Sequence, residues 1–362
     1  MTSYVRYHPD VEQVPDDEAE TIARIIRSFE TEVDMVAKKE GHAMRGSHAK
    51  ASGYAVGELV IENGLPEELA QGLFARPGRH EVMVRWAQGP GEHLDDSVSI
   101  HRGMAIRVLG LGADIRQVDD PHVQDFVLAT GDTFLHSTAK TFQLDFSAGV
   151  SKAPALPQAV KGAVSVAARV AEAGLEAVGM SSPTLSFFGN PKCHPLADIY
   201  FSQAPLRWGN HIAKVAAVPS DGALATIGDP EVDTNGRPNA FRDATVAIMS
   251  RHGAEFELRV QLCTDLEEMP VEDASKRWSQ EDSPYRTVAR VVLPSQNAYN
   301  EARRRFFDEG VGFSPGYALA AHRPLGGIMR ARMATYPALQ AYRRRINGVE
   351  PISPKSLCEV PD

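Results

Sequence analysis

Short segments in which apolar and polar side chains alternate limit the folds open to this chain more than any other feature. A period of two is typical of β-strands that bury one face. In residues 82–87, Val82, Val84 and Trp86 share one face, and Arg85 lies on the other. Four further strands are predicted on similar grounds, in residues 104–109, 123–129, 256–262 and 287–293.

Three segments are predicted to be helical. Residues 16–40 carry apolar side chains at spacings of three and four, residues 155–179 are rich in Ala and Val, and the tail from 295 to 347 is helix-like. Two groups of strands, separated and followed by helices, indicate an α+β fold with a mainly antiparallel sheet or barrel. Regular strand–helix alternation is absent from the sequence.

The composition argues against several classes of partner. The 362 residues carry a formal net charge of −9, whereas binding to a nucleic-acid backbone needs clustered cations. We interpret two basic runs, Arg303–Arg305 and Arg343–Arg345, as solvated faces or intramolecular contacts. Residues 155–180 are the longest apolar-rich stretch, but four charges make them too polar for a membrane span. We therefore expect no nucleic-acid partner and no membrane partner.

The start of the chain and its cysteines favour a cytoplasmic location. Residues 1–10 are polar and show no signal-peptide pattern. The 3 cysteines are widely spaced and form no CxxC motif, so reduced thiols fit better than disulfides or a zinc site.

Three short segments hold residues that could carry chemistry, although each also has an ordinary structural interpretation. They are residues 45–51, 84–87 and 332–337. His48 is one of 12 histidines, Tyr336 could simply pack, and Arg332 could be a helix-face cation. Arg85 is harder to explain, because a cation in an alternating strand needs solvent or an anionic partner. Spacing alone does not decide between these interpretations.

Taken together, the segments resemble the catalase superfamily. Arg45–Ala51 resembles R-x-x-H-A-K-G, with alanine in place of the final glycine, and Val84–Ala87 resembles V-R-F-S. Residues 103–107 resemble the G-F-A-V-K strand, and residues 313–343 resemble the proximal R-x-x-x-Y-P signature. The resemblance runs from about residue 40 to 346 and is weak between 150 and 250. The short chain and residues 322–327 are similar to the minimal catalase-related haem proteins.

The resemblance implies a catalase-like closed antiparallel β-barrel with flanking helices that binds haem b. Tyr336 would be the iron ligand as phenolate. Arg332, one helical turn earlier, would support that charge by a hydrogen bond. Pro337 disfavours a helical Tyr336, so we expect a fresh helical stretch to begin at the proline.

Four more residues would hold the cofactor if the resemblance is followed. Arg45, Arg85 and Arg343 would pair with the two haem propionates, which explains a cation in the strand. Phe142 falls where the family stacks an aromatic ring on the porphyrin edge.

On the distal side the resemblance makes His48 the acid–base group. The sequence departs from the family at three neighbouring positions. Thr130 aligns with the distal asparagine, Ala87 replaces a serine behind the histidine, and Ser47 replaces an aliphatic residue. Ser47 could hydrogen-bond the imidazole, and the missing amide would weaken binding of a second peroxide. These departures argue against efficient disproportionation of hydrogen peroxide.

The predicted function is therefore a haem-dependent, peroxidase-like oxidoreductase that acts on organic hydroperoxides or hydrogen peroxide and uses an organic reductant. A true catalase, a fatty-acid hydroperoxide lyase or dehydrase, and a non-catalytic haem protein are the alternatives. The predicted organisation is a helical arm at 1–40, a haem-binding domain at 41–346 and a tail at 347–362. A homo-oligomer is possible.

Overall fold

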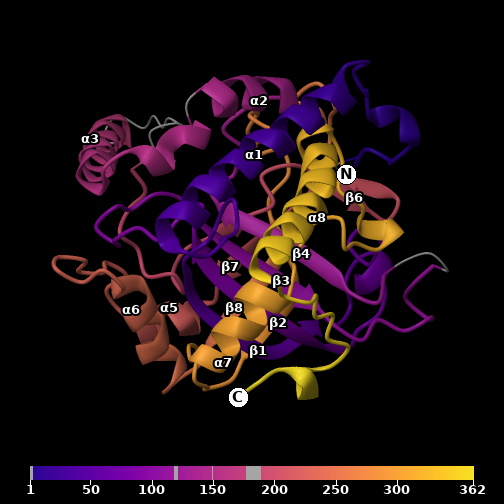
Figure 1. Ribbon diagram of the computed structural model, residues 1–362. Helices are drawn as coiled ribbons and strands as arrows, with labels where there is room; N and C mark the ends of the chain where they lie inside the picture. Colours follow the sequence, from indigo (N-terminus) through magenta and orange to yellow (C-terminus); the bar gives the residue numbers. More distant parts are fainter. Residues whose placement is uncertain (1–2, 118–120, 149, 177–188) are drawn as a thin grey trace.

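The core of the protein is a closed barrel of eight antiparallel strands. The computed structural model describes residues 3–117, 121–148, 150–176 and 189–362 (Figure 1). β5 pairs with both β4 and β7, and β1 pairs with both β2 and β9, so the ring is closed. β6 (Leu206–Trp208) extends the sheet beside β7. The barrel strands are β1 (Ala51–Ile61), β2 (Arg79–Gln88), β3 (Arg102–Val108), β4 (Gln124–Thr130), β5 (Tyr200–Phe201), β7 (His211–Pro219), β8 (Ala254–Leu262) and β9 (Arg286–Leu293).

The inside of the barrel is filled by one apolar face of each long strand. Val82, Val84 and Trp86 of β2 belong to this core, together with Met104 and Ile106 of β3. Alternation along the strands puts the intervening residues outside the barrel, where the helices cover them. Burial of the apolar faces explains why the predicted period-two segments became barrel strands.

Helices cover the outside of the barrel. α1 (Glu18–Glu40) packs against α2 (Ala139–Ala148) and α8 (Gly327–Asn347), and Figure 1 shows α1 and α8 running across the same side of the barrel. The remaining elements are α3 (Gln158–Glu176), α5 (Asp221–Ile227), α6 (Ala240–Met249), α7 (Glu301–Arg304), the π-helical turn η4 (Arg305–Gly310) and the short 3₁₀ turns η1 (Pro9–Val11), η2 (Gly72–Phe74), η3 (Val150–Ala155), η5 (Ala320–His322) and η6 (Leu357–Glu359).

The structure confirms the α+β class and the closed barrel, and it changes two details of the predicted helices. The expected tail helix is broken, because residues 311–326 contain only the turn η5 between η4 and α8. The prediction of a new helix at Pro337 is wrong, since the proline lies inside the continuous helix α8. The predicted helix at 155–179 is described only as far as Glu176, and its last residues lie outside the described ranges.

Two further observations concern the helices and the cysteines of the described residues. Every helix in the described ranges is too short or too polar to cross a lipid bilayer. Cys193, Cys263 and Cys358 all carry free thiols.

Candidate functional site

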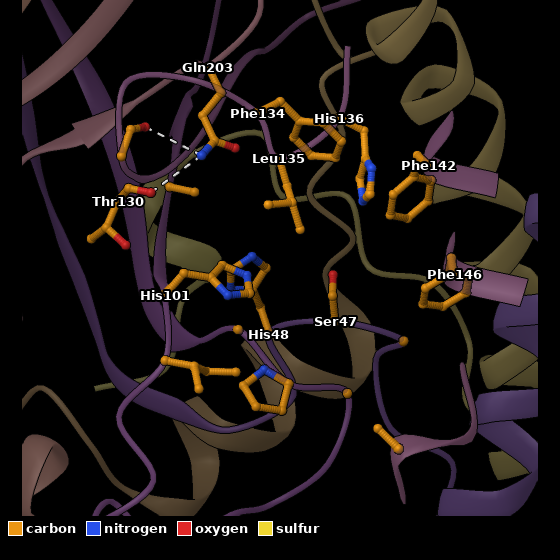
Figure 2. A pocket seen from close by; sticks show the side chains of 18 of the residues that line it. Ser47, His48, His101, Thr130, Phe134, Leu135, His136, Phe142, Phe146 and Gln203 are labelled. Carbon is orange, nitrogen blue, oxygen red and sulfur yellow. Dashed lines mark hydrogen bonds between the residues drawn. The ribbon is translucent and has the colours of Figure 1, made fainter. Parts of the chain in front are cut away.

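A cavity of about 550 Å³ lies between the barrel rim and the helices α1, α2 and α8. Six of the predicted site residues line it, namely Ser47, His48, Thr130, Phe142, Arg332 and Tyr336. Figure 2 shows His48 and Ser47 facing aromatic side chains across this space. The other three predicted residues, Arg45, Arg85 and Arg343, form a separate cluster that reaches the cavity through the backbone of His48.

The backbone around His48 is held in an unusual conformation. Its φ of 55° lies in the left-handed region, which residues other than glycine seldom adopt. The Nη2 of Arg85 donates to the His48 carbonyl oxygen at 2.9 Å, and the His48 N–H donates to the carbonyl oxygen of Gly89 at 2.8 Å. A Cβ at Gly103 would lie 2.6 Å from Cε1 of the imidazole. The ring position therefore depends on a neighbouring residue without a side chain.

The imidazole of His48 is neutral at physiological pH. Burial lowers its pKa to about 3, and the nearby Arg85 and Arg332 guanidinium groups act in the same direction. Nδ1 is buried without a hydrogen-bond partner in the described structure. Ala87 has no hydroxyl to offer, and the predicted bond from Ser47 is not among the hydrogen bonds of the described residues. The ring is thus a neutral base whose buried nitrogen is not fixed by a side chain.

Arg332 and Tyr336 meet on one face of α8, as their spacing of four residues predicts. The Nη2 of Arg332 donates to the Tyr336 phenol oxygen at 3.2 Å. The same nitrogen lies 3.4 Å from the Val127 carbonyl oxygen in β4, which ties the pair to the barrel. The phenol oxygen, the atom that would bind a metal, therefore accepts a hydrogen bond from a cationic group.

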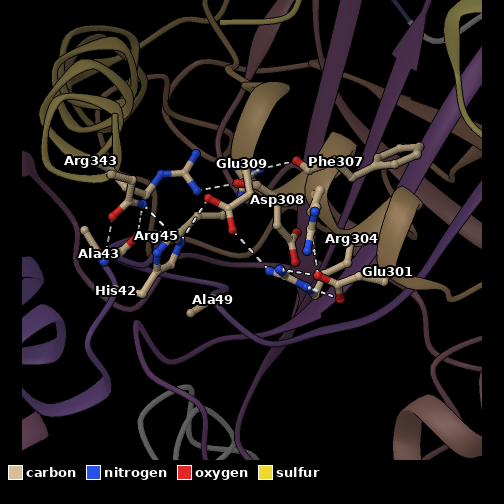
Figure 3. A network of polar contacts seen from close by, with 12 residues as sticks. His42, Ala43, Arg45, Ala49, Glu301, Arg304, Phe307, Asp308, Glu309 and Arg343 are labelled. Carbon is tan, nitrogen blue, oxygen red and sulfur yellow. Dashed lines mark hydrogen bonds and ion pairs between the residues drawn. The ribbon is translucent and has the colours of Figure 1, made fainter. Parts of the chain in front are cut away.

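The three remaining arginines lie around one residue, Asp308, whose side chain is 17% exposed. The Nε of Arg85 donates to Asp308 Oδ1 at 2.8 Å. Arg343 donates to the Asp308 backbone oxygen, and Arg45 donates to the Phe307 oxygen at 2.6 Å (Figure 3). Arg85 contacts the carboxylate itself, whereas Arg45 and Arg343 donate to backbone oxygens. The three guanidinium groups and Asp308 together carry an excess of two positive charges.

Positive charge in this cluster exceeds the negative charge of Asp308. Burial lowers the pKa of Arg45 well below its ordinary range, and the charges of Arg85 and Arg343 add to this effect. A guanidinium stays protonated in proteins, so the buried charge of Arg45 lies near two further positive charges. Nε of Arg45 and Nη2 of Arg343 are buried without hydrogen-bond partners in the described residues. Two carboxylates, such as those of a haem, would fit both the charge and the free donors.

Asp308 was not predicted from the sequence. It lies in the π-helical turn η4, and Tyr54 donates to its Oδ2 at 2.6 Å. Burial raises the pKa of Asp308, but Arg85 and Arg45 outweigh this and keep the pKa below the ordinary value. In the basic run at 303–305, Arg304 and Arg305 pair with Glu301, so these two cations make intramolecular contacts.

Thr130 lies at the cavity wall with its hydroxyl already engaged. Its Oγ1 accepts hydrogen bonds from the Arg102 N–H at 3.0 Å and from the Asn190 side-chain amide at 3.1 Å. Asn190 also lines the cavity. The amide missing at position 130 is thus present nearby on another segment, and no local pattern in the sequence indicated this.

Aromatic side chains form the opposite wall. Phe142 of α2 stacks on Phe146, with ring centroids 5.2 Å apart, and it also contacts Phe134 and Phe29 of α1. Such a wall suits a flat apolar group or the apolar part of a ligand.

A second histidine, His101, lines the cavity beside His48. The two rings meet edge-on with centroids 5.3 Å apart. Burial lowers the pKa of His101 well below its ordinary value, and His48 and Arg102 contribute in the same direction. Both imidazoles are therefore neutral near pH 7.

Comparisons with known proteins find similarity at the level of structure. A scan against protein-family models finds no match, and a search of the curated proteins finds none. A fungal catalase has 18% identity and a TM-score of 0.59, covering 86% of this chain and 61% of its own. Catalase A from Saccharomyces cerevisiae has 15% identity and a TM-score of 0.58, covering 95% and 67%. A bacterial catalase has 18% identity and a TM-score of 0.61, covering 97% and 66%.

These alignments extend over most of the chain but over only about two thirds of each solved catalase. Because the sequence identities are low, these alignments bear on the fold of the chain and not on its chemistry. Together with the closed barrel, they show that this chain has a catalase-like fold.

Proposed function

We propose that the protein is a haem b-dependent, peroxidase-like oxidoreductase that reduces organic hydroperoxides or hydrogen peroxide. The observation that carries this proposal is the pair of groups in one cavity: a neutral imidazole at His48 and a phenol at Tyr336 that accepts a hydrogen bond from Arg332. An acid–base group and a metal ligand are the two protein functions that this chemistry requires.

The chain's residues fit the proposed cofactor. Tyr336 would bind the iron as phenolate, and Arg332 would stabilise its charge. Arg45, Arg85 and Arg343 would bind the two propionates in addition to their contacts with Asp308, as the excess of positive charge suggests. Phe142 would pack at the edge of the macrocycle. When bound, haem would supply a redox-active iron that can exchange electrons with a peroxide and a reductant.

His48 would move the proton of the peroxide. As a neutral base, its imidazole can take a proton from one peroxide oxygen and return it to the oxygen that leaves. Because its pKa is about 3, the base form is present throughout the physiological range.

The lining of the cavity favours organic hydroperoxides over hydrogen peroxide alone. Phe134, Leu135, Phe142 and Phe146 give it a broad apolar wall, which a small polar oxidant does not need. A channel for hydrogen peroxide alone would be narrow and polar.

A true catalase is the second candidate, and Asn190 is the observation in its favour. Its amide lies at the cavity wall, 3.1 Å from Thr130 Oγ1. It could orient a second peroxide in place of the asparagine that the family carries at position 130.

The proposal also covers the reductant, the cellular location, the oligomeric state and the bounds of the haem-binding domain. We propose an organic reductant, a cytoplasmic location and a homo-oligomer, with the haem-binding domain at 41–346. α1 supplies Ile25 and Phe29 to the cavity wall, so the segment before residue 41 would take part in the site.

Steady-state turnover decides between the two candidates. We expect cumene hydroperoxide to be reduced readily when a phenolic reductant is present, and we expect oxygen evolution from hydrogen peroxide to be slow. The His48→Ala variant should lower peroxide reduction by about 10²–10⁴-fold while keeping the haem. A wild-type protein that evolves oxygen as fast as a true catalase would establish the second candidate instead.

Restoring the family residues should shift the balance between the two activities. The double variant Ser47→Val with Thr130→Asn should raise oxygen evolution from hydrogen peroxide, by up to about 10²-fold, because a fixed amide positions the second peroxide. Oxygen-electrode measurements on both proteins at equal haem content test this. An unchanged rate would mean that the Asn190 amide already positions the second peroxide.

A further inference from the structure

One buried carboxyl on the cavity wall has no place in the mechanism so far. Glu32 of α1 is 6% exposed, and its Oε2 has no hydrogen-bond partner in the described residues. It lines the cavity together with Gly46, Ser47 and Gly91. Buried carboxyl groups without a cationic partner are rare, and they are frequently functional.

Two lysines, Lys39 and Lys161, bind a different carboxylate, Glu92. Nζ of Lys39 lies 2.9 Å from Glu92 Oε2, and Lys161 of α3 donates to Glu92 Oε1. Glu92 also lines the cavity. With both lysines committed to Glu92, Glu32 is left without an ion pair.

The chain leaves room for the Glu32 carboxyl beside the segment that carries His48. A Cβ at Gly91 would lie 2.8 Å from Glu32 Oε1 and 2.6 Å from the Gly46 carbonyl oxygen. Gly46 precedes Ser47 and His48 directly. The carboxyl is therefore next to the backbone that positions the imidazole.

The surroundings of Glu32 favour its protonated form. Burial raises its pKa to about 8; the charge of Glu92 acts in the same direction, and Lys161 opposes both. The other titratable or charged side chains that line the cavity are His48, His101, Asp132, His136, Arg277, Arg332 and Tyr336. Burial lowers the pKa of His48 to about 3 and that of His101 well below its ordinary value, so neither ring holds a second proton near pH 7.

We propose that Glu32 holds a proton at neutral pH and supplies it to the cavity while a hydroperoxide is reduced. This inference rests on the proposed function. His48 can move a proton that the peroxide brings, but it cannot store one, whereas Glu32 can.

The reaction balances with an organic phenol as reductant. One hydroperoxide ROOH and two phenols ArOH give ROH, water and two phenoxyl radicals; the O–O bond breaks and its two oxygens gain the electrons. Glu32 lends a proton to one of these oxygens and regains a proton that the phenols lose. Lys39 binds Glu92 and is half exposed, so it links the cavity wall around Glu32 and Glu92 to solvent.

The first test needs neither haem nor substrate. Infrared difference spectra of the apoprotein should show a protonated carboxyl band that titrates near pH 8. The band should be absent in Glu32→Gln and present in Glu20→Gln, an exposed change in the same helix. Its absence from the wild type at pH 7 would overturn the proposal.

Protein stability gives an independent readout of the same titration. The folded-state pKa of about 8 exceeds the ordinary value of 4.5, so the folded protein binds the proton more tightly than the unfolded chain. The stabilisation is fully present below about pH 4.5 and is lost as the pH rises through 8. Glu32→Gln should therefore unfold at a higher temperature than the wild type at pH 9, and no such gain is expected for Glu20→Gln.

The last test concerns the transfer itself. Hydroperoxide reduction by the wild type should decline above pH 8, whereas Glu32→Gln should be about 10²-fold slower at pH 7 and should lack this decline. A Glu32→Gln profile identical to that of the wild type would refute proton supply even if the infrared band is present. If the haem-loaded wild type reduces no peroxide at all, the proposed function fails and proton supply fails with it, while the infrared titration separately reports the protonation of Glu32.

Discussion

The Tyr336→Phe variant is expected to lose stable haem binding. The change removes the phenol oxygen to which Arg332 donates at 3.2 Å, and with it the only atom of that side chain able to bind iron. Phenylalanine keeps the ring, and α8 should form as before. Hemin titration of the apoprotein, followed by absorbance, should show weak and unsaturable binding in place of a defined complex.

Two matched variants separate ligation from general damage to the cavity. His48→Ala changes the opposite wall and should keep the haem. Tyr342→Phe removes the phenol of another α8 tyrosine, which donates to Asp34 on the surface of α1, and should bind haem normally. If Tyr336→Phe binds hemin with wild-type affinity and spectrum, Tyr336 is not the ligand.

The Arg85→Leu variant is expected to lower the free energy of unfolding by about 3–5 kcal/mol, because it breaks the ion pair with the largely buried Asp308 carboxylate. Arg85 is 5% exposed and pairs with Asp308 at 2.8 Å. It also donates to the His48 carbonyl oxygen, so the backbone that holds the imidazole loses a contact as well. We expect a lower thermal midpoint in the apoprotein and lower haem occupancy after reconstitution.

The same strand provides the control for this change. Arg79 pairs with Glu58 at 2.7 Å, but both side chains are largely exposed. Arg79→Leu should cost about 0–1 kcal/mol, as surface ion pairs do. Equal losses for the two variants in urea unfolding would contradict the role given to Arg85.

The position of a residue could be predicted from the sequence where the repeat of its strand or helix alone decides which face it lies on. Arg85 had to lie on the face opposite Val84 and Trp86, and it does. Arg332 and Tyr336 had to share one face of a helix, and their side chains touch. In both cases the spacing alone determines the contact once the type of element is known.

Residues placed by tertiary contacts could not be predicted in this way. In β1, buried positions alternate with less buried ones over residues 55–61, but Gly57 occupies one of the buried positions, where a Cβ would lie 2.2 Å from the Val292 oxygen of β9. The apolar alternation is therefore interrupted in the sequence. β5 has only two residues. Asp308 depends on a π-helical turn, and Asn190 is 60 residues from the threonine that it binds.

The helix predictions failed where packing overrides local preference. Pro337 removes one backbone donor, yet α8 continues on both sides of it. Beyond the proline, Gln340 donates to the Phe313 oxygen at 2.8 Å and Arg343 reaches Asp308. These contacts hold the second half of α8 in line with the first.

Hemin titration of the purified wild-type protein tests the proposed function most directly. The cluster of Arg45, Arg85 and Arg343 and the Arg332–Tyr336 pair predict one tightly bound haem per chain, with the absorption spectrum of a high-spin ferric haem that has a phenolate ligand. A protein that is purified without colour and binds no hemin in this titration would contradict the haem-dependent function, whatever the similarity of its fold to the catalases.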